Sequence, residues 1–106
     1  DEHYTVVVPR TMDDIVYEGK ALRHCVGGYA QRHFEGVTVI VFIRRKESVS
    51  TPYFTVELNP RSGSIVQIHG LRNCNPDPDL QAFGDAWQKE VQERRKKRHT
   101  KEKKTA

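Results

Sequence analysis

Apolar and polar positions along the chain predict four β-strands. The segment from Val37 to Ile43 is apolar or β-branched at every position, which is typical of a central strand covered on both faces. Tyr53 to Leu58 alternates between apolar and polar side chains, as a strand with one buried face does. Ile65 to His69 alternates in the same way after a turn-forming stretch, NPRSG. Tyr4 to Val8 ends at Pro9, which cannot donate to a sheet, and this predicts an edge strand.

Helical spacing predicts helices before and after these strands. Thr11 precedes two aspartates and is expected to cap a helix from Met12 to Lys20. A short second helix is expected from Tyr29 to Glu35. Asp77 and Pro78 are expected to begin the last helix, whose apolar stripe is Leu80, Phe83, Trp87 and Val91. Together these elements predict an α+β fold. It has a mainly antiparallel sheet of three or four strands, the C-terminal helix on one face, and short N-terminal helices on the other face or at its edge.

The two alternating strands are expected to form a hairpin with matched apolar faces. Matching puts Val66 and Ile68 on the core side, because a slip by one residue would send both to the opposite side. Ile65 is then expected on the opposite, polar side. A solvated surface is one interpretation of this polar face, and a pocket beneath the first helix is another. The polar side chains that share the face are Thr55, Glu57, Gln67 and His69.

The stretch LRHCVGGY at residues 22–29 combines polar, sulfur-bearing and glycine residues. Adjacent glycines are unfavourable inside helices and strands, so we expect a structured corner here. One interpretation is structural, with Cys25 as a small buried side chain and His24 bonded to a backbone carbonyl. In the other interpretation, His24, Cys25 and Tyr29 belong to a functional pocket.

The corner also carries a family resemblance. LRHCVGGY, followed by EGVTVIVFIRR, PYFTVEL, IVQIHGLRN and a helix containing Trp87, resembles the PcfJ-like domain. The preceding VPRTMDDIVYEGKAL resembles the lead-in of that domain, so the likeness runs from about Val8 to Trp87. The resemblance implies an origin in plasmid or phage genes and an association with conjugation and other mobile-element functions. It brings no settled biochemical activity.

Several side chains are candidates for chemistry. Cys25 is a candidate nucleophile if a nearby base lowers its pKa, and His69 is better placed for that role than the adjacent His24. Glu57 could orient a histidine or transfer protons. The spacing of Cys25 and Cys74 favours reduced thiols, with a single bridge as an open alternative. No metal site or cofactor is expected. The candidate pocket consists of His24, Cys25, Glu57 and Gln67, with Tyr29, Arg44, Thr55, His69 and Asn73 around them.

Charge is unevenly distributed along the 106 residues, whose formal net charge is +4 at pH 7. Residues 89–106 hold nine Lys or Arg against three Glu, whereas the rest of the chain carries nine basic and eleven acidic groups. We therefore expect a folded domain over residues 1–92 and a basic helical extension over residues 93–106. Attraction for nucleic acid belongs to the extension, through Arg94, Arg95, Lys96, Lys97 and Arg98.

Two function classes remain. No apolar run approaches the roughly 20 residues of a membrane span and no signal-peptide pattern is present, so we expect a soluble cytoplasmic protein without membrane contact. In the first class, it is a mobile-element accessory protein that binds nucleic acid through its extension, a protein partner through its folded part, or both. In the second class, it is a small enzyme that acts on nucleic acid or a nucleotide-like ligand. The sequence leaves catalysis, the partner and the oligomeric state open.

Overall fold

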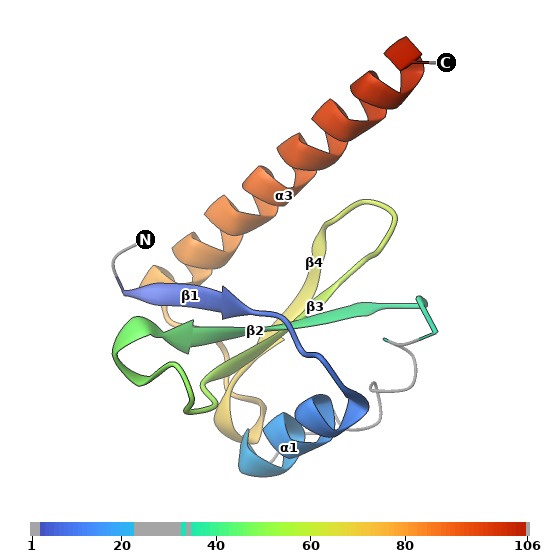
Figure 1. The fold of residues 1–106 in the computed structure, drawn as a ribbon. Helices are drawn as coiled ribbons and strands as arrows, with labels where there is room; N and C mark the ends of the chain where they lie inside the picture. Colours follow the sequence, from blue (N-terminus) through green and yellow to red (C-terminus); the bar gives the residue numbers. More distant parts are fainter. Residues whose placement is uncertain (1–2, 23–32, 34, 106) are drawn as a thin grey trace.

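A computed structural model describes residues 3–22, 33 and 35–105, with side chains to Lys96 except that of Asn73. The strands are β1 (Tyr4–Val7), β2 (Val39–Arg45), β3 (Phe54–Leu58) and β4 (Ile65–His69). The helices are α1 (Met12–Leu22) and α3 (Pro78–Thr105), with short 3-10 turns η2 (Lys46–Ser48) and η3 (Leu71–Asn73). The strands form one antiparallel sheet in the order β1-β2-β3-β4 (Figure 1). The α+β prediction is confirmed.

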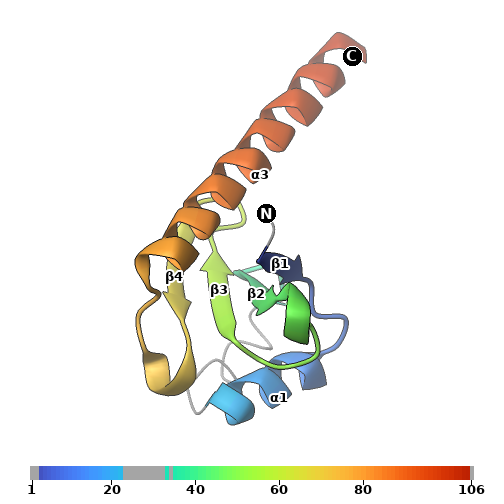
Figure 2. The same cartoon turned by 90° about the vertical axis from the view of Figure 1, so that its left-hand side faces the viewer.

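β2 lies inside the sheet and separates two apolar clusters. Ile40 and Phe42 point toward α1, where they pack with Ile15. Val41 and Ile43 point the other way, toward the cluster that contains Leu80 of α3. α1 and α3 therefore cover opposite faces of the sheet (Figures 1 and 2). Because both faces of β2 are covered, its sequence up to Ile43 is apolar without interruption. β2 begins two residues later than predicted.

The β3–β4 hairpin confirms the predicted polar face but corrects one part of the register. Thr55 pairs with His69, and Glu57 pairs with Gln67, so these four side chains share a face. A β-bulge then shifts the pairing, and Leu58 lies opposite Ile65. The prediction that Val66 faces the core and Ile65 the polar side is wrong. The bulge leaves Val66 60% exposed and turns Ile65 onto the cluster with Leu80.

Both long helices begin with the predicted side-chain caps. At the start of α1, Thr11 and Asp14 exchange hydrogen bonds, each side chain accepting from the other's backbone N–H at 3.2 Å. The Arg10 and Thr11 N–H groups also lower the pKa of Asp14. At the start of α3, Asp77 Oδ1 accepts from Leu80 N at 2.9 Å. The predicted second helix falls largely outside the described residues.

α3 is fastened to the β3–β4 hairpin by one side of the helix. Gln88 accepts from Ile65 N at 2.5 Å, and Gln92 donates to Ser62 O at 3.1 Å. Arg95 donates to the backbone carbonyl of Arg61. We call these contacts of Gln88, Gln92 and Arg95 the hairpin clamp. The clamp holds α3 to the hairpin as far as Arg95, and the helix continues to Thr105 as a single element.

Candidate functional site

A chain of polar side chains crosses the α1-facing side of the sheet. Glu57 accepts two hydrogen bonds, from Thr38 Oγ1 to Oε2 at 2.7 Å and from Gln67 Nε2 to Oε1 at 2.9 Å. Gln67 Oε1 in turn lies 3.0 Å from His69 Nε2. We call Thr38, Glu57, Gln67 and His69 the polar row. Its members come from three parts of the chain, and the antiparallel register brings them together.

The hydrogen bonds of the polar row indicate which ring nitrogen of His69 is the donor. The amide oxygen of Gln67 can only accept, so His69 Nε2 carries a proton in this arrangement. His69 Nδ1 is buried and has no hydrogen-bond partner among the residues that the structure describes. In the neutral ring, Nδ1 then carries a buried lone pair. An imidazole oriented by a second polar group is the arrangement that a general base requires.

The outer end of the polar row borders a surface groove. The groove has a volume of about 720 Å³ and lies between β4 and the first turns of α3. Gln67 and His69 line it together with Gln81, Asp85 and Gln88. Ligands in solvent can thus approach the two outer members of the row. Thr38, by contrast, is buried at the inner end.

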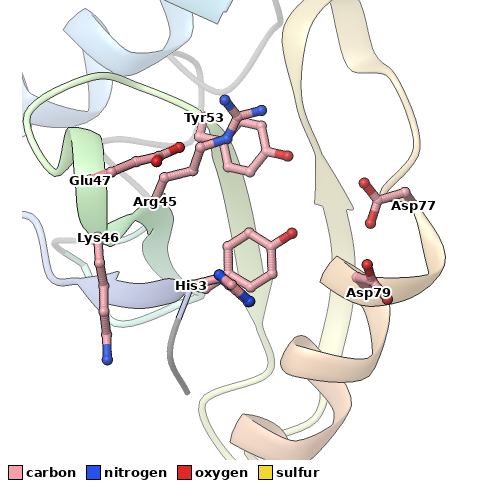
Figure 3. A pocket seen from close by; sticks show the side chains of 8 residues that line it. His3, Arg45, Lys46, Glu47, Tyr53, Asp77 and Asp79 are labelled. Carbon is pink, nitrogen blue, oxygen red and sulfur yellow. The ribbon is translucent and has the colours of Figure 1, made fainter.

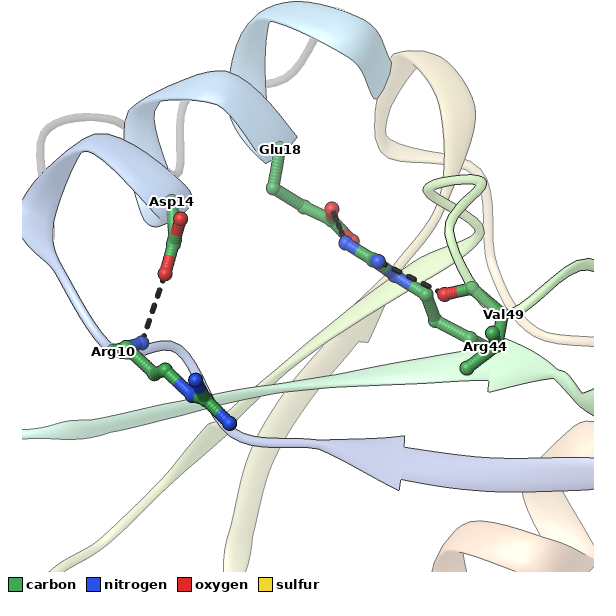
Figure 4. Close-up of polar contacts among 5 residues, drawn as sticks. All are labelled: Arg10, Asp14, Glu18, Arg44 and Val49. Atoms are coloured by element: carbon green, nitrogen blue, oxygen red, sulfur yellow. Dashed lines mark hydrogen bonds and ion pairs between the residues drawn. The ribbon is translucent and has the colours of Figure 1, made fainter.

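A buried ion pair lies on the same face of the sheet. Arg44 Nη2 of β2 donates to Glu18 Oε1 of α1 at 2.5 Å, and Arg44 Nη1 donates to Val49 O at 3.0 Å (Figure 4). Glu18 is fully buried, and neither its Oε2 nor the Arg44 Nε has a hydrogen-bond partner in the part of the chain that the structure describes. Burial raises the pKa of Glu18, and the opposing effect of Arg44 is smaller. The pair joins α1 to the centre of the sheet.

The structure brings together part of the predicted pocket. Thr55, Glu57, Gln67 and His69 share one face as predicted. Arg44 bonds to Glu18 instead of joining the polar row. Asn73 ends η3 beyond β4, and its side chain is not described. Three predicted members lie outside the described residues: His24, Cys25 and Tyr29.

Three residues near the site were not predicted. Glu18 follows Ile15 by three residues and precedes Leu22 by four, so helical spacing could have placed it on the buried side of α1. Thr38 precedes β2 and gives no sequence signal. His33 is half-buried and accepts from Ile40 N through Nδ1 at 2.8 Å. Burial lowers the pKa of His33.

A second pocket, of about 420 Å³, lies between the end of the sheet and the start of α3 (Figure 3). Tyr4 and Tyr53 stack there with ring centroids 6.2 Å apart, and Arg45 lies 4.3 Å above the Tyr53 ring. Burial, reinforced by Tyr53 and nearby aspartates, raises the pKa of Tyr4. Basic and acidic groups both line the pocket, so it offers phosphate no clear electrostatic advantage. The charged residues are Arg45, Lys46, Glu47, Asp77 and Asp79, and His3 also lines the pocket.

The basic part of α3 leaves the sheet after the hairpin clamp (Figure 1). Arg94 forms an exposed ion pair with Glu90 at 2.6 Å. Such exposed pairs are worth about 0–1 kcal/mol, so Arg94 can exchange Glu90 for another anion. Lys97 and Arg98 continue the basic run along the helix backbone.

The described residues show neither a cluster of metal ligands nor a membrane-spanning helix. Across residues 3–22, 33 and 35–105, no three His, Cys, Asp or Glu side chains gather as a metal site would require. In the same parts of the chain, no helix has both the length and the apolar character needed to cross a membrane. Cys74 is exposed and has a free thiol.

These features define a small α+β domain with a four-stranded meander between two helices. The chain belongs to the PcfJ-like proteins, because the model of that family matches residues 1–83. It is also 38% identical over 97 residues to an uncharacterized protein from Listeria innocua serovar 6a, a match that covers 90% of this chain. The chain spans 21% of the length of that relative. No solved structure matches it.

Proposed function

We propose that this domain is a mobile-element accessory module that binds nucleic acid through the basic part of α3. The observation that supports the proposal is the single helix from Pro78 to Thr105, whose residues 89–105 hold nine basic and three acidic groups. Phosphate neutralisation by Lys and Arg supplies most of the affinity in binding of low sequence specificity. The mobile-element role rests on the PcfJ-like family, and the folded part is left available for a protein partner.

Neutralising the extension is expected to weaken nucleic-acid binding far more than neutralising the domain. The test variant carries Lys97→Gln, Arg98→Gln and Lys101→Gln. Its matched control carries Arg10→Gln, Lys20→Gln and Lys46→Gln, at exposed positions outside α3. Both variants lose three positive charges. Fluorescence anisotropy with a labelled DNA duplex should show a log-log salt slope that is less negative by about 2 to 3 in the test variant.

The control variant should keep the wild-type salt slope. Equal weakening in both variants would mean that net charge alone drives binding. Weakening in the control alone would place the contact surface on the domain. Unchanged melting temperatures would show that both variants remain folded.

A second candidate function is catalysis at the polar row on nucleic acid or a nucleotide-like ligand. The observation in its favour is His69, whose Nε2 is hydrogen-bonded to Gln67 while its buried Nδ1 has no partner within the described residues. His69 would act as a base, and Glu57 would hold Gln67 in place. The candidate pocket from the sequence, including His24 and Cys25, belongs to this proposal.

Catalysis at the row predicts that Glu57→Gln removes turnover while the fold persists. The substitution leaves size unchanged but replaces one carboxylate oxygen by an NH2 group, so either Thr38 or Gln67 loses its acceptor. The assay is hydrolysis of labelled DNA, RNA and nucleoside triphosphates by wild type and variant, with thermal melting in parallel. If the variant only loses stability, by about 1–3 kcal/mol, the row is a structural network.

A further inference from the structure

We infer that α3 presents its basic part as a preformed helix that fits the major groove of duplex DNA. The inference rests on the proposed function and adds the form of nucleic acid that is bound. The competing possibility is a flexible basic tail, which would attract single strands and duplexes of either kind through charge alone. The preformed helix and the flexible tail differ in whether binding requires helical structure in the basic residues.

The hairpin clamp is closely packed as well as hydrogen-bonded. Gly63, in the turn of the hairpin, has a positive φ of 72°, and a Cβ there would lie 3.3 Å from Arg95 Cδ. The turn is thus packed closely against the helix at its last clamped residue. Leu80 is buried on the sheet. From Leu80 to Arg95, α3 is thus held to the domain along about four turns.

This anchoring explains how so basic a segment can be helical. Isolated helices shorter than about 12–15 residues are marginal in water because the first turn is costly to form. Like charges three or four residues apart lower helix stability further. A segment that continues an anchored helix needs no new first turn. The clamp therefore favours helix in residues 96–105, and phosphates would relieve the repulsion between their charges.

The helical period then places the charges. Positions 88, 92 and 95 of α3 lie on the side fastened to the hairpin. With about 3.6 residues per turn, positions 94, 97, 101 and 104 lie on the opposite side, and all four are Lys or Arg. From the first to the last they advance by ten residues, or about 15 Å of helix. Four Lys or Arg positions thus lie on the side of the helix opposite the hairpin clamp.

Groove dimensions select the partner. The major groove of B-DNA is about 12 Å wide and admits an α-helix. The major groove of duplex RNA is deep and narrow, and side chains cannot read it. A helix with Lys or Arg positions along its unclamped side therefore fits duplex DNA better than duplex RNA. A DNA-bound helix would contact phosphates on both flanks of the groove.

The test changes the helix without changing its charge. Thr100 lies within the basic part of α3. Thr100→Pro removes a helical hydrogen bond and clashes with the preceding turn, whereas Thr100→Ala favours helix. The probes are a 20-base-pair DNA duplex, the RNA duplex of the same sequence and one DNA strand alone. All are measured by anisotropy at one salt concentration.

We expect Thr100→Pro to bind duplex DNA at least about tenfold more weakly than wild type, because the proline breaks the helix between Arg98 and Lys101. Thr100→Ala should bind as well as wild type or better. Wild type should prefer the DNA duplex to the RNA duplex. Helicity by circular dichroism should be lower in Thr100→Pro, with Trp87 fluorescence unchanged.

Two results would overturn the inference in distinguishable ways. Equal binding by Thr100→Pro and wild type, with no preference among the three probes, would show a flexible polycation and leave the proposed nucleic-acid function intact. Absence of wild-type binding to every probe at low salt would remove the proposed function and this inference with it.

Discussion

Leu80→Ala is expected to cost about 2–5 kcal/mol of unfolding free energy. Leu80 is fully buried in the cluster that joins α3 to the sheet. Removing its side chain leaves a cavity against Val56 and Ile68, which the packed sheet cannot fill by relaxing. Since domains of this size are stable by only about 5–15 kcal/mol, the loss should be large in chemical denaturation.

The matched control is Leu71→Ala. Leu71 belongs to η3 and is 52% exposed, so the same change in chemistry should alter stability by no more than about 0.5 kcal/mol. Similar midpoints for the two variants would show that α3 does not depend on Leu80 for its packing. A loss confined to Leu80→Ala would support the packing of α3 on the sheet through Leu80.

The sequence predicts the sheet well where one face is buried. Alternation in Phe54–Leu58 fixes which side chains point to the core, and the uniform apolarity of β2 marks it as the strand covered on both sides. The local caps Thr11 and Asp77 are also readable, because they depend on residues three positions away. These features need only local spacing.

The bulge at Val66 could not be predicted in the same way. The turn ends with a backbone bond from Asn59 N to Ser64 O, and the pairing beyond it must gain one residue to bring Ile65 onto the core. Turn geometry and packing against α3 decide this together. Simple alternation assumes that no residue is inserted, and it therefore put Val66 on the wrong side.

The candidate site was predictable only in part for a related reason. The sequence predicts that Glu57 and Gln67 share a face, because the alternation of side chains along each strand determines the face on which each one lies. Thr38 joins them from the segment before β2, and no local pattern links the two. Arg44 is predicted near the polar row, but it forms an ion pair with Glu18 of α1. Which cation meets which carboxylate depends on how α1 docks on the sheet.

Arg44→Met is the other substitution with a large expected effect. Its side chain is 13% exposed, and that of its partner Glu18 is fully buried. Removing one member of a buried pair leaves an uncompensated charge, at a cost of about 3–5 kcal/mol. The thermal unfolding temperature at neutral pH should fall accordingly. Arg44 also holds the Val49 carbonyl, which would lose its donor.

The double variant Arg44→Met with Glu18→Leu separates the charge from the packing. An apolar pair of similar volume is often as stable as a buried ion pair or more so. We therefore expect the double variant to recover most of the stability that Arg44→Met loses. If it stayed as unstable as the single variant, the loss would come from packing or from the Val49 contact.

The pH dependence provides the sharpest test of the ion pair. Burial raises the pKa of Glu18 in the folded state, and Arg44 opposes that rise. A carboxyl group whose folded pKa is raised gives stability below its unfolded pKa, and this stability is lost as the pH increases through the folded pKa. Without Arg44 the rise should be greater. The deficit of Arg44→Met relative to Arg44→Met with Glu18→Gln should thus be largest at neutral pH and shrink toward the ordinary carboxyl pKa. A deficit that does not change with pH would mean that Glu18 stays ionised without its partner, and that the site is more hydrated than its burial implies.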